Sequence, residues 1–189
     1  MIPLPTLGGY NGGAAGVNDR GEVVGAAENT ISDPTCPSPQ VRQIEPVVWY
    51  YGRVRELPNF PGDTVGAAHA INAKGQITGW SGNCAMTLVH AMHWKNGRAI
   101  YLGSLGGTGD AEGLGINNQG QVVGYGYVAG NATYDAFLWR NGVITDLGTL
   151  PAGRGERGSC HQQQRPSGGR LGGPVRKRPW RHLAKGRDH

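Results

Sequence analysis

His90 and His93 are the closest pair of histidines in the main body of the sequence, and imidazole is a common metal ligand. A separation of three residues along a strand points the two side chains to opposite faces of a sheet. The His-Glu-x-x-His arrangement that binds zinc on a helix does not occur. We therefore expect solvent-exposed or cross-strand roles for both histidines and no metal site.

Three aspartates, Asp63, Asp110 and Asp146, lie in or near predicted turns, where their carboxylate oxygens could bind calcium. Aspartate is also common in turns because its side chain accepts local backbone hydrogen bonds. We favour this local role for all three residues.

The glycine-rich stretch 103–109 lacks a complete Gly-x-Gly-x-x-Gly leading into a helix, so we do not expect it to bind phosphates. No Gly-x-Ser-x-Gly nucleophile motif occurs either. We predict no catalytic residue, no cofactor and no enzymatic activity.

Two of the three cysteines, Cys36 and Cys84, lie in loops that follow the second predicted strand of their repeats. A secreted chain could join them in a disulfide, although the two loops differ in length. The sequence leaves this pairing open.

The sequence contains 34 Gly and 12 Pro among 189 residues, a composition that indicates disorder unless the residues follow a repeating pattern. The formal net charge of +5 is also uneven. Residues 1–152 carry 8 Lys+Arg and 11 Asp+Glu, a net of −3, whereas residues 153–189 carry 10 and 2, a net of +8. No apolar run approaches the roughly 18 residues of a membrane-spanning helix, and no signal peptide is visible.

Such a pattern is present: the sequence contains an internal repeat with a period of 45 residues, and a Pro-rich insert lengthens the first copy to 53 residues. Each copy contains the segment Asn-x-x-Gly-Glu/Gln, at 18–22, 72–76 and 117–121. A tryptophan follows in each copy, at Trp49, Trp94 and Trp139. Several residue types recurring in the same order at one spacing are a strong indication of a repeat fold.

Each copy is typical of four short antiparallel strands joined by tight turns. In each Asn-x-x-Gly turn the glycine adopts the left-handed backbone conformation that the turn requires. These glycines are Gly21, Gly75 and Gly120, and the turns of the second and third copies begin at Asn72 and Asn117. The Asn-Gly pairs ending at Gly97 and Gly142 favour type I′ hairpins. The tryptophans are expected to fill the layers between copies.

The predicted fold is therefore all-β, with tandem four-stranded antiparallel units of about 45 residues, as in a β-propeller. Repeat 1 covers 1–56 with the insert at 29–45, repeat 2 covers 57–101 and repeat 3 covers 102–152. Known propellers have about four to eight blades, so three units suggest a fragment of a propeller, an assembly of copies or an open array. We favour the fragment.

The third copy resembles a known family. Its segments Leu-Gly-x-Leu-Gly-Gly, Ile-Asn-x-x-Gly-Gln-Val-Val-Gly and Ala-Phe-Leu-Trp-x-Asn-Gly-x-Ile-Thr-Asp-Leu-Gly resemble the extracellular HAF repeat, named after a His-Ala-Phe tripeptide. Asp135 replaces the histidine in repeat 3, and His90-Ala91-Met92 keeps two of the three residues in repeat 2. The resemblance implies a secreted or cell-surface protein, mostly bacterial, and supplies no catalytic residues.

The basic segment 153–189 has the composition of an out-of-frame fourth repeat. Shifting the codons of residues 160–169 by one nucleotide permits Ala-Ile-Asn-Asn-Ser-Gly-Gln-Val-Val-Gly, which is the missing motif in register. The same shift across residues 181–188 permits the missing tryptophan block. We therefore hypothesise a frameshift near residues 152–158 and expect a disordered basic tail.

The function that these observations favour is a non-catalytic, extracellular or cell-surface module with a binding or scaffolding role. Its partner would be a protein or glycan bound at the rim of loops. Two alternatives remain open: a fragment of a polysaccharide-active propeller enzyme, and nucleic-acid binding through the basic tail, which we do not favour.

Overall fold

The computed structural model describes residues 3–131 and 133–148, which form three four-stranded antiparallel sheets and contain no helix. Sheet 1 consists of β1 (Gly12–Val17), β2 (Val23–Ser32), β3 (Arg42–Tyr50) and β4 (Arg53–Glu56). Sheet 2 consists of β5 (Val65–Ile71), β6 (Ile77–Gly82), β7 (Val89–Lys95) and β8 (Arg98–Tyr101). Sheet 3 consists of β9 (Gly106–Ile116), β10 (Val122–Val128), β11 (Tyr134–Arg140) and β12 (Val143–Gly148).

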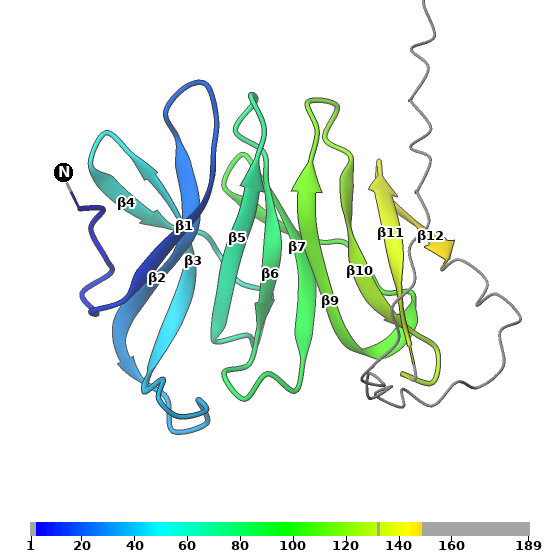
Figure 1. The fold of residues 1–189 in the computed structure, drawn as a ribbon, viewed down its shortest axis with the longest axis horizontal. Coiled ribbons are helices and arrows are strands. Elements are labelled where there is room, and N and C mark those ends of the chain that lie inside the picture. The colour runs from blue at the N-terminus through cyan, green and yellow to red at the C-terminus, as the bar shows by residue number, and fades with distance from the viewer. Residues whose placement is uncertain (1–2, 132, 149–189) are drawn as a thin grey trace, which may run out of the picture. The chain divides into compact units, whose positions relative to one another are not determined.

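Each sheet is a simple meander, because its strands pair in the order in which they occur in the chain (Figure 1). The all-β prediction with tandem four-stranded units is confirmed. Each sheet lies within one of the three predicted repeats. The predictions for 153–189, including the disordered tail, lie outside the described residues.

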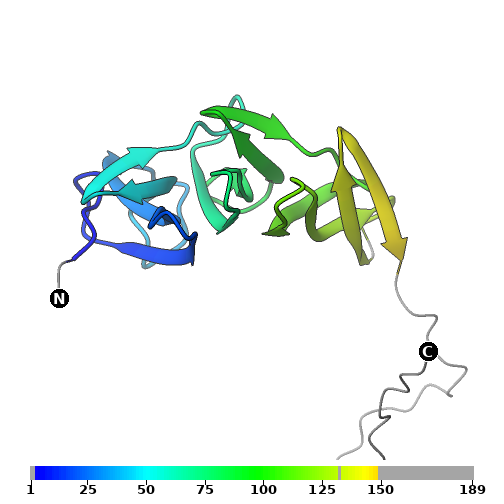
Figure 2. The ribbon, with the colours of Figure 1, turned by 90° about the horizontal axis from the view of Figure 1, so that it is seen from above.

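Successive sheets pack face to face, as Figure 2 shows from above. One core cluster joins Val24 and Val48 of sheet 1 to Ile77, Met92 and Trp94 of sheet 2. Because strand side chains alternate between faces, each sheet has one face for the sheet before it and one for the sheet after it. We call the second of these the following face.

A second cluster repeats this arrangement between sheets 2 and 3. It joins Ala91 of sheet 2 to Val122, Phe137 and Trp139 of sheet 3. Ile77, Met92 and Trp94 of the first junction are therefore equivalent in the repeat to Val122, Phe137 and Trp139 of the second. A single sheet could not bury them, and the apolar contacts between sheets supply the core.

The three recurring tryptophans are buried, with exposed fractions of 2%, 1% and 8% for Trp49, Trp94 and Trp139. Trp94 and Trp139 lie at the two junctions. Trp49 instead lies in a third cluster with Ala27 and Val47, on the face of sheet 1 that points away from sheet 2. The expectation that the tryptophans fill the layers between copies therefore applies to two of the three.

The indole Nε1 of Trp49 donates a hydrogen bond to the carbonyl of Pro5 at 2.7 Å, and that of Trp94 to Pro58 at 2.8 Å. Trp49 and Trp94 thus each fix the segment that leads into their own repeat.

Glycine has a second use in the second strand of each sheet. A Cβ on Gly79 would collide with the backbone carbonyl of Ala67 on the neighbouring strand β5. The equivalent Gly25 and Gly124 meet the same obstacle. The glycine that ends each Val-Val-Gly or Ile-Thr-Gly segment is therefore required by close strand approach.

Among the described residues, no helix is present that could cross a membrane.

Candidate functional site

The three asparagine turns, residues 18–22, 72–76 and 117–121, connect the first and second strands of their sheets. In the second turn, Oδ1 of Asn72 accepts hydrogen bonds from the backbone N–H of Lys74 and Gln76 at 3.0 and 2.9 Å. Its Nδ2 donates to Oε1 of Gln76 at 2.7 Å. The first residue of the motif therefore fixes the loop, and the fifth residue holds the first in place.

The other two turns repeat these bonds. Asn18 accepts from the backbone of Arg20 and Glu22, and Asn117 accepts from Gln119 and Gln121. The glutamate or glutamine at the fifth position is a structural part of the motif that the sequence reasoning did not identify. Its recurrence in all three copies is the sequence signal that could have identified it.

Glycine occupies the fourth position of each turn because the backbone there is left-handed. The φ angles are 74°, 75° and 78° at Gly21, Gly75 and Gly120. The hairpins between third and fourth strands behave similarly, with φ of 74° at Gly97 and 86° at Gly142. The asparagines before the last two glycines also have positive φ, as a type I′ turn requires.

The turns of successive repeats are linked to one another. Nδ2 of Asn18 donates to the backbone carbonyl of Asn72 at 3.1 Å, and Nδ2 of Asn72 donates to that of Asn117 at 2.8 Å. The backbone N–H of Ala73 also donates to Oδ1 of Asn118 at 3.0 Å. One asparagine therefore shapes its own turn and positions the next.

The linked turns surround an open hollow of about 440 Å³. Its lining comes from all three repeats: Val17, Asn18, Asp19, Ile71, Asn72, Ala73, Ile116, Asn117, Asn118 and Gln119. Asp19 is the only charged residue in this lining, which is otherwise rich in amides. Side-chain amides both donate and accept hydrogen bonds, so the hollow suits hydroxyl or peptide groups.

The predicted opposite orientation of the two histidines is confirmed. Nδ1 of His93 faces the carbonyl of Ile77 on the adjacent strand at 3.0 Å, and its ring lies 5.4 Å from that of Trp139 in sheet 3. Burial lowers the pKa of His93. His90 lies on the other face, where its ring is 4.3 Å from that of Phe60.

Asp63 departs from its predicted local role. One carboxylate oxygen accepts a hydrogen bond from the Ser81 hydroxyl at 2.6 Å and lies 2.9 Å from Nδ1 of His90. These partners are distant in sequence, so no local pattern identified them. Ser81 is fully buried and donates to Asp63 rather than to His90. The group therefore lacks the nucleophile–base hydrogen bond of a serine triad.

The other two aspartates differ from each other. Oδ1 of Asp146 accepts a hydrogen bond from the backbone N–H of Gly148 at 2.7 Å, which is the predicted local role. Asp110 lies inside strand β9 and borders a hollow of about 410 Å³ with three tyrosines, Tyr125, Tyr127 and Tyr134. Burial raises the pKa of Asp110.

Glu45 is a buried acid that the sequence did not single out. Its carboxylate accepts hydrogen bonds from the side-chain amides of Asn29 and Asn59 at 3.1 and 2.7 Å. It is 5% exposed. Burial raises its pKa to about 7, and the hydrogen bond from Asn59 opposes this shift only in part.

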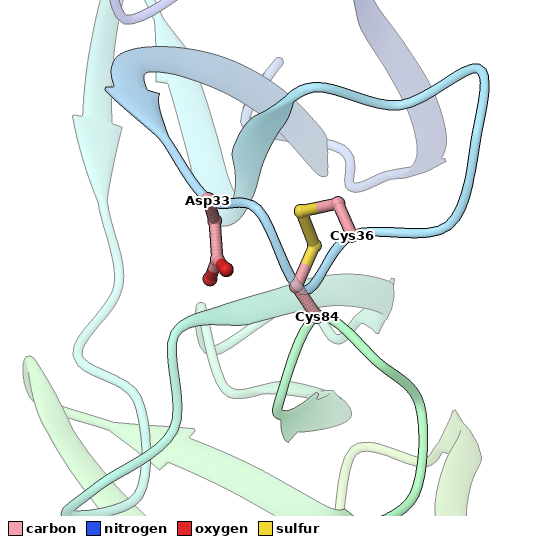
Figure 3. A group of neighbouring side chains, drawn as sticks. All are labelled: Asp33, Cys36 and Cys84. Carbon is pink, nitrogen blue, oxygen red and sulfur yellow. A yellow bond between two sulfur atoms is a disulfide. The ribbon is translucent and has the colours of Figure 1, made fainter.

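Cys36 and Cys84 form a disulfide, with their Cα atoms 4.6 Å apart. The bond connects the Pro-rich insert of repeat 1 to the β6–β7 loop of sheet 2, and Asp33 lies beside it (Figure 3). The Asp33 carboxylate and the two sulfurs lie within 4.8 Å of one another. Because a metal-binding cysteine needs a free thiolate, the disulfide leaves no thiolate for a metal at this cluster.

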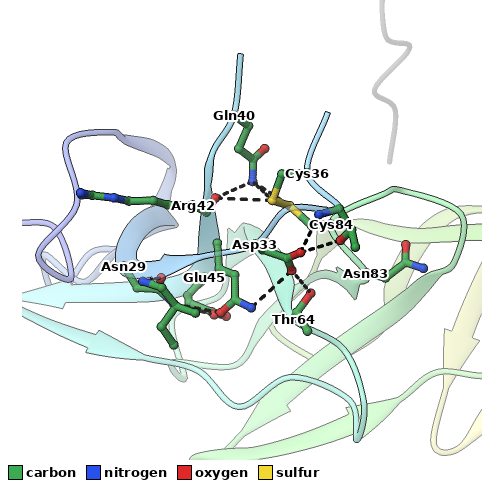
Figure 4. The surroundings of a disulfide bond; sticks show 12 residues. Asn29, Asp33, Cys36, Gln40, Arg42, Glu45, Thr64, Asn83 and Cys84 are labelled. Carbon is green, nitrogen blue, oxygen red and sulfur yellow. Dashed lines mark hydrogen bonds between the residues drawn. A yellow bond between two sulfur atoms is a disulfide. The ribbon is translucent and has the colours of Figure 1, made fainter. Parts of the chain in front are cut away.

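Hydrogen bonds around the disulfide hold the insert in place (Figure 4). Nε2 of Gln40 donates to the carbonyl of Arg42 at 2.8 Å, and the hydroxyl of Thr64 donates to Asp33 at 3.3 Å. Hydrogen bonds from Thr35 lower the pKa of Asp33. The open question of cysteine pairing is therefore answered by a disulfide that spans the junction of sheets 1 and 2.

Comparison with known proteins gives no assignment, because no protein-family model, curated protein or solved structure matches the chain.

Proposed function

We propose that the chain is a non-catalytic β-repeat module of the extracellular HAF type, secreted or on the cell surface, that binds a protein or glycan ligand at the asparagine turns. The observation that carries this proposal is the linkage of equivalent turns from all three repeats around one polar hollow. Repeat proteins characteristically bind ligands on surfaces to which each repeat contributes the same position.

The groups offered to a ligand support a binding role. Asp19, Ala73, Asn118 and Gln119 are exposed, while Asn72 at the centre is 4% exposed and held by its own turn. The arrangement therefore combines a fixed backbone with accessible polar groups, which limits the entropy lost on binding. Amides suit sugar hydroxyls and peptide groups equally, so both ligand classes belong to the proposal.

The disulfide supports the extracellular location. Disulfides persist in oxidising compartments and are rare where thiols are kept reduced. The Cys36–Cys84 bond joins residues separated by 48 positions and spans two sheets. A structural bond of this kind is expected of a protein that works outside the reducing cytosol.

A binding assay with the full chain tests the proposed site. The probes are an array of neutral and acidic glycans together with immobilised extracellular-matrix proteins. We expect at least one probe to bind, and the double substitution Asn118→Ala and Gln119→Ala to weaken that binding by about tenfold, equivalent to about 1.4 kcal/mol. Thr87→Ala, in an exposed loop between β6 and β7, is the matched control.

Unchanged binding by the double variant would place the ligand elsewhere. A chain that binds no probe of either class contradicts the proposed ligand classes. Hydrolysis of a bound polysaccharide contradicts the non-catalytic assignment.

A further inference from the structure

The following face of sheet 3 is uncovered by the residues that the structure describes. Val123 is 48% exposed there, whereas the equivalent Val24 and Thr78 of sheets 1 and 2 are fully buried. Tyr134, on the same face, is 59% exposed. A position that is buried at two successive junctions is therefore open at the third.

The face of sheet 1 that points away from sheet 2 is also apolar and exposed. Leu4, Ala14, Ala15, Gly16, Val17 and Val23 line a hollow of about 520 Å³ on sheet 1. Val17 is 66% exposed and Leu4 is 43% exposed. The equivalents of Val17 are Ile71 and Ile116, which are half-buried because a preceding sheet lies beside them.

The hydrogen bonds between the asparagine turns stop at the same two ends. Nδ2 of Asn117 donates to Gln121 within its own turn, and within the described part of the chain it has no acceptor in a following turn. The backbone carbonyl of Asn18 accepts from Gly21 but from no preceding asparagine there. One end thus offers the donor, and the other end offers the acceptor, of the bond that links turns inside the row.

We propose that a second copy of this chain packs its sheet 1 against the following face of sheet 3, in a head-to-tail contact that continues the series of junctions. In this contact Val123 and Leu138 of one copy lie against the Leu4–Val17–Val23 surface of the next. Nδ2 of Asn117 donates to the carbonyl of Asn18 in the neighbouring copy, as Asn18 and Asn72 do within the chain.

The second copy is favoured as the occupant because the contact uses surfaces that the chain already pairs twice. At each junction within the chain, the following face of one sheet packs against the preceding face of the next sheet. The two exposed surfaces are the following face of sheet 3 and the preceding face of sheet 1, so they form a pair of the same type. The described parts of two copies contain six sheets, within the roughly four to eight blades of known propellers. A contact between different patches of identical chains is heterologous, so it either closes a ring or extends into a chain.

The experiment measures the mass of the full chain in solution by light scattering and sedimentation. We expect a species of at least twice the chain mass that dissociates on dilution. Val123→Lys and Val17→Lys should each give a monomer, since each places a charge in one half of the contact. Tyr51→Lys is the control, because Tyr51 is 85% exposed and lies in the turn between β3 and β4.

Mixing the two monomeric variants tests the head-to-tail geometry. The Val17→Lys chain keeps an intact sheet 3 face, and the Val123→Lys chain keeps an intact sheet 1 face. A 1:1 mixture should therefore form heterodimers, although neither variant associates alone. A β-sheet circular dichroism spectrum and a single cooperative thermal transition in both variants would confirm that they fold.

Three results would overturn the proposal. The first is a wild-type chain that stays monomeric at all concentrations. The second is association that survives either single substitution, which indicates a different surface. The third is a mixture of folded variants that remains monomeric. If the wild-type chain stays monomeric, the hollow lined by tyrosines on the following face of sheet 3 is free to bind a small ligand instead of a second copy.

Discussion

The following faces of sheet 1 and sheet 3 have the same place in the repeat and different surroundings. On sheet 1, Val24 and Val48 are buried against Met92 and Trp94 of sheet 2. On sheet 3, Val123 is half exposed and three tyrosines border an open hollow. The comparison shows that a repeat of this kind obtains its core from its neighbours, so stability is distributed over junctions rather than over sheets.

The largest expected difference comes from placing a charge on each face. Val24→Lys buries an ammonium group at a closed junction and should lower the free energy of unfolding by about 5 kcal/mol. Val123→Lys at the equivalent exposed position should change it by less than about 0.5 kcal/mol in dilute monomer. Urea unfolding of both variants measures the difference. Equal losses would show that the two faces are equally covered.

The next effect concerns the junction that carries the disulfide. Replacing Cys36 and Cys84 with serine should cost about 4 kcal/mol, the loop-closure entropy of a bond across 48 residues. Amide exchange should accelerate at the junction of sheets 1 and 2 more than at that of sheets 2 and 3. Reduced wild-type protein is the control and should match the double variant. An equal increase in amide exchange at both junctions would contradict a stabilising effect confined to the junction of sheets 1 and 2.

The third effect is the pH dependence of stability, which tests the buried carboxyl group of Glu45. The pKa of Glu45 is raised from 4.5 to about 7, so the folded chain retains a proton that the unfolded chain releases between these values. Stability therefore decreases as pH rises through this range, by at most about 3 kcal/mol. Glu45→Gln should remove this decrease in thermal unfolding scans from pH 4 to 8.

The control Thr87→Ala, in the exposed loop between β6 and β7, should keep the wild-type profile. A Glu45→Gln variant that still loses stability between pH 4.5 and 7 would assign the pH dependence to another group.

The smallest effect separates Asn72 from Asn117. Both hold their own turns, but only Asn72 also donates to the next turn. Asn72→Ala should therefore cost about 1 kcal/mol more than Asn117→Ala, the net value of one hydrogen bond. Denaturant unfolding measures both. Identical costs in the dilute monomer would show that the link between turns adds nothing to stability.

The periodic features were predictable because each depends on local chemistry repeated three times. Positive φ at Gly75 and Gly97, burial of Trp94 and the four-strand unit all follow from residues adjacent in sequence. Strand β9 was less predictable, since it begins at Gly106 within a glycine-rich stretch. The glycines that precede Glu112 have low strand propensity, and pairing with β10 overrides it.

The non-periodic features could not be predicted in this way. The Asp63–Ser81–His90 cluster depends on contacts between separate strands and a linker. The disulfide depends on how the insert of repeat 1 folds back over sheet 2, which loop length alone does not determine. The raised pKa of Glu45 follows from its burial, and the equivalent residue of repeat 2 is His90, so the repeat pattern does not indicate a buried acid at this position.

The double use of each motif asparagine also bears on how such a protein evolves. Because every repeat carries both a donor and an acceptor for its neighbours, duplication or deletion of one whole unit restores the hydrogen bond between neighbouring turns without any compensating substitution. The number of units can therefore change in single genetic steps. Loss of one residue within a turn, by contrast, breaks the register of donor and acceptor on both sides of it.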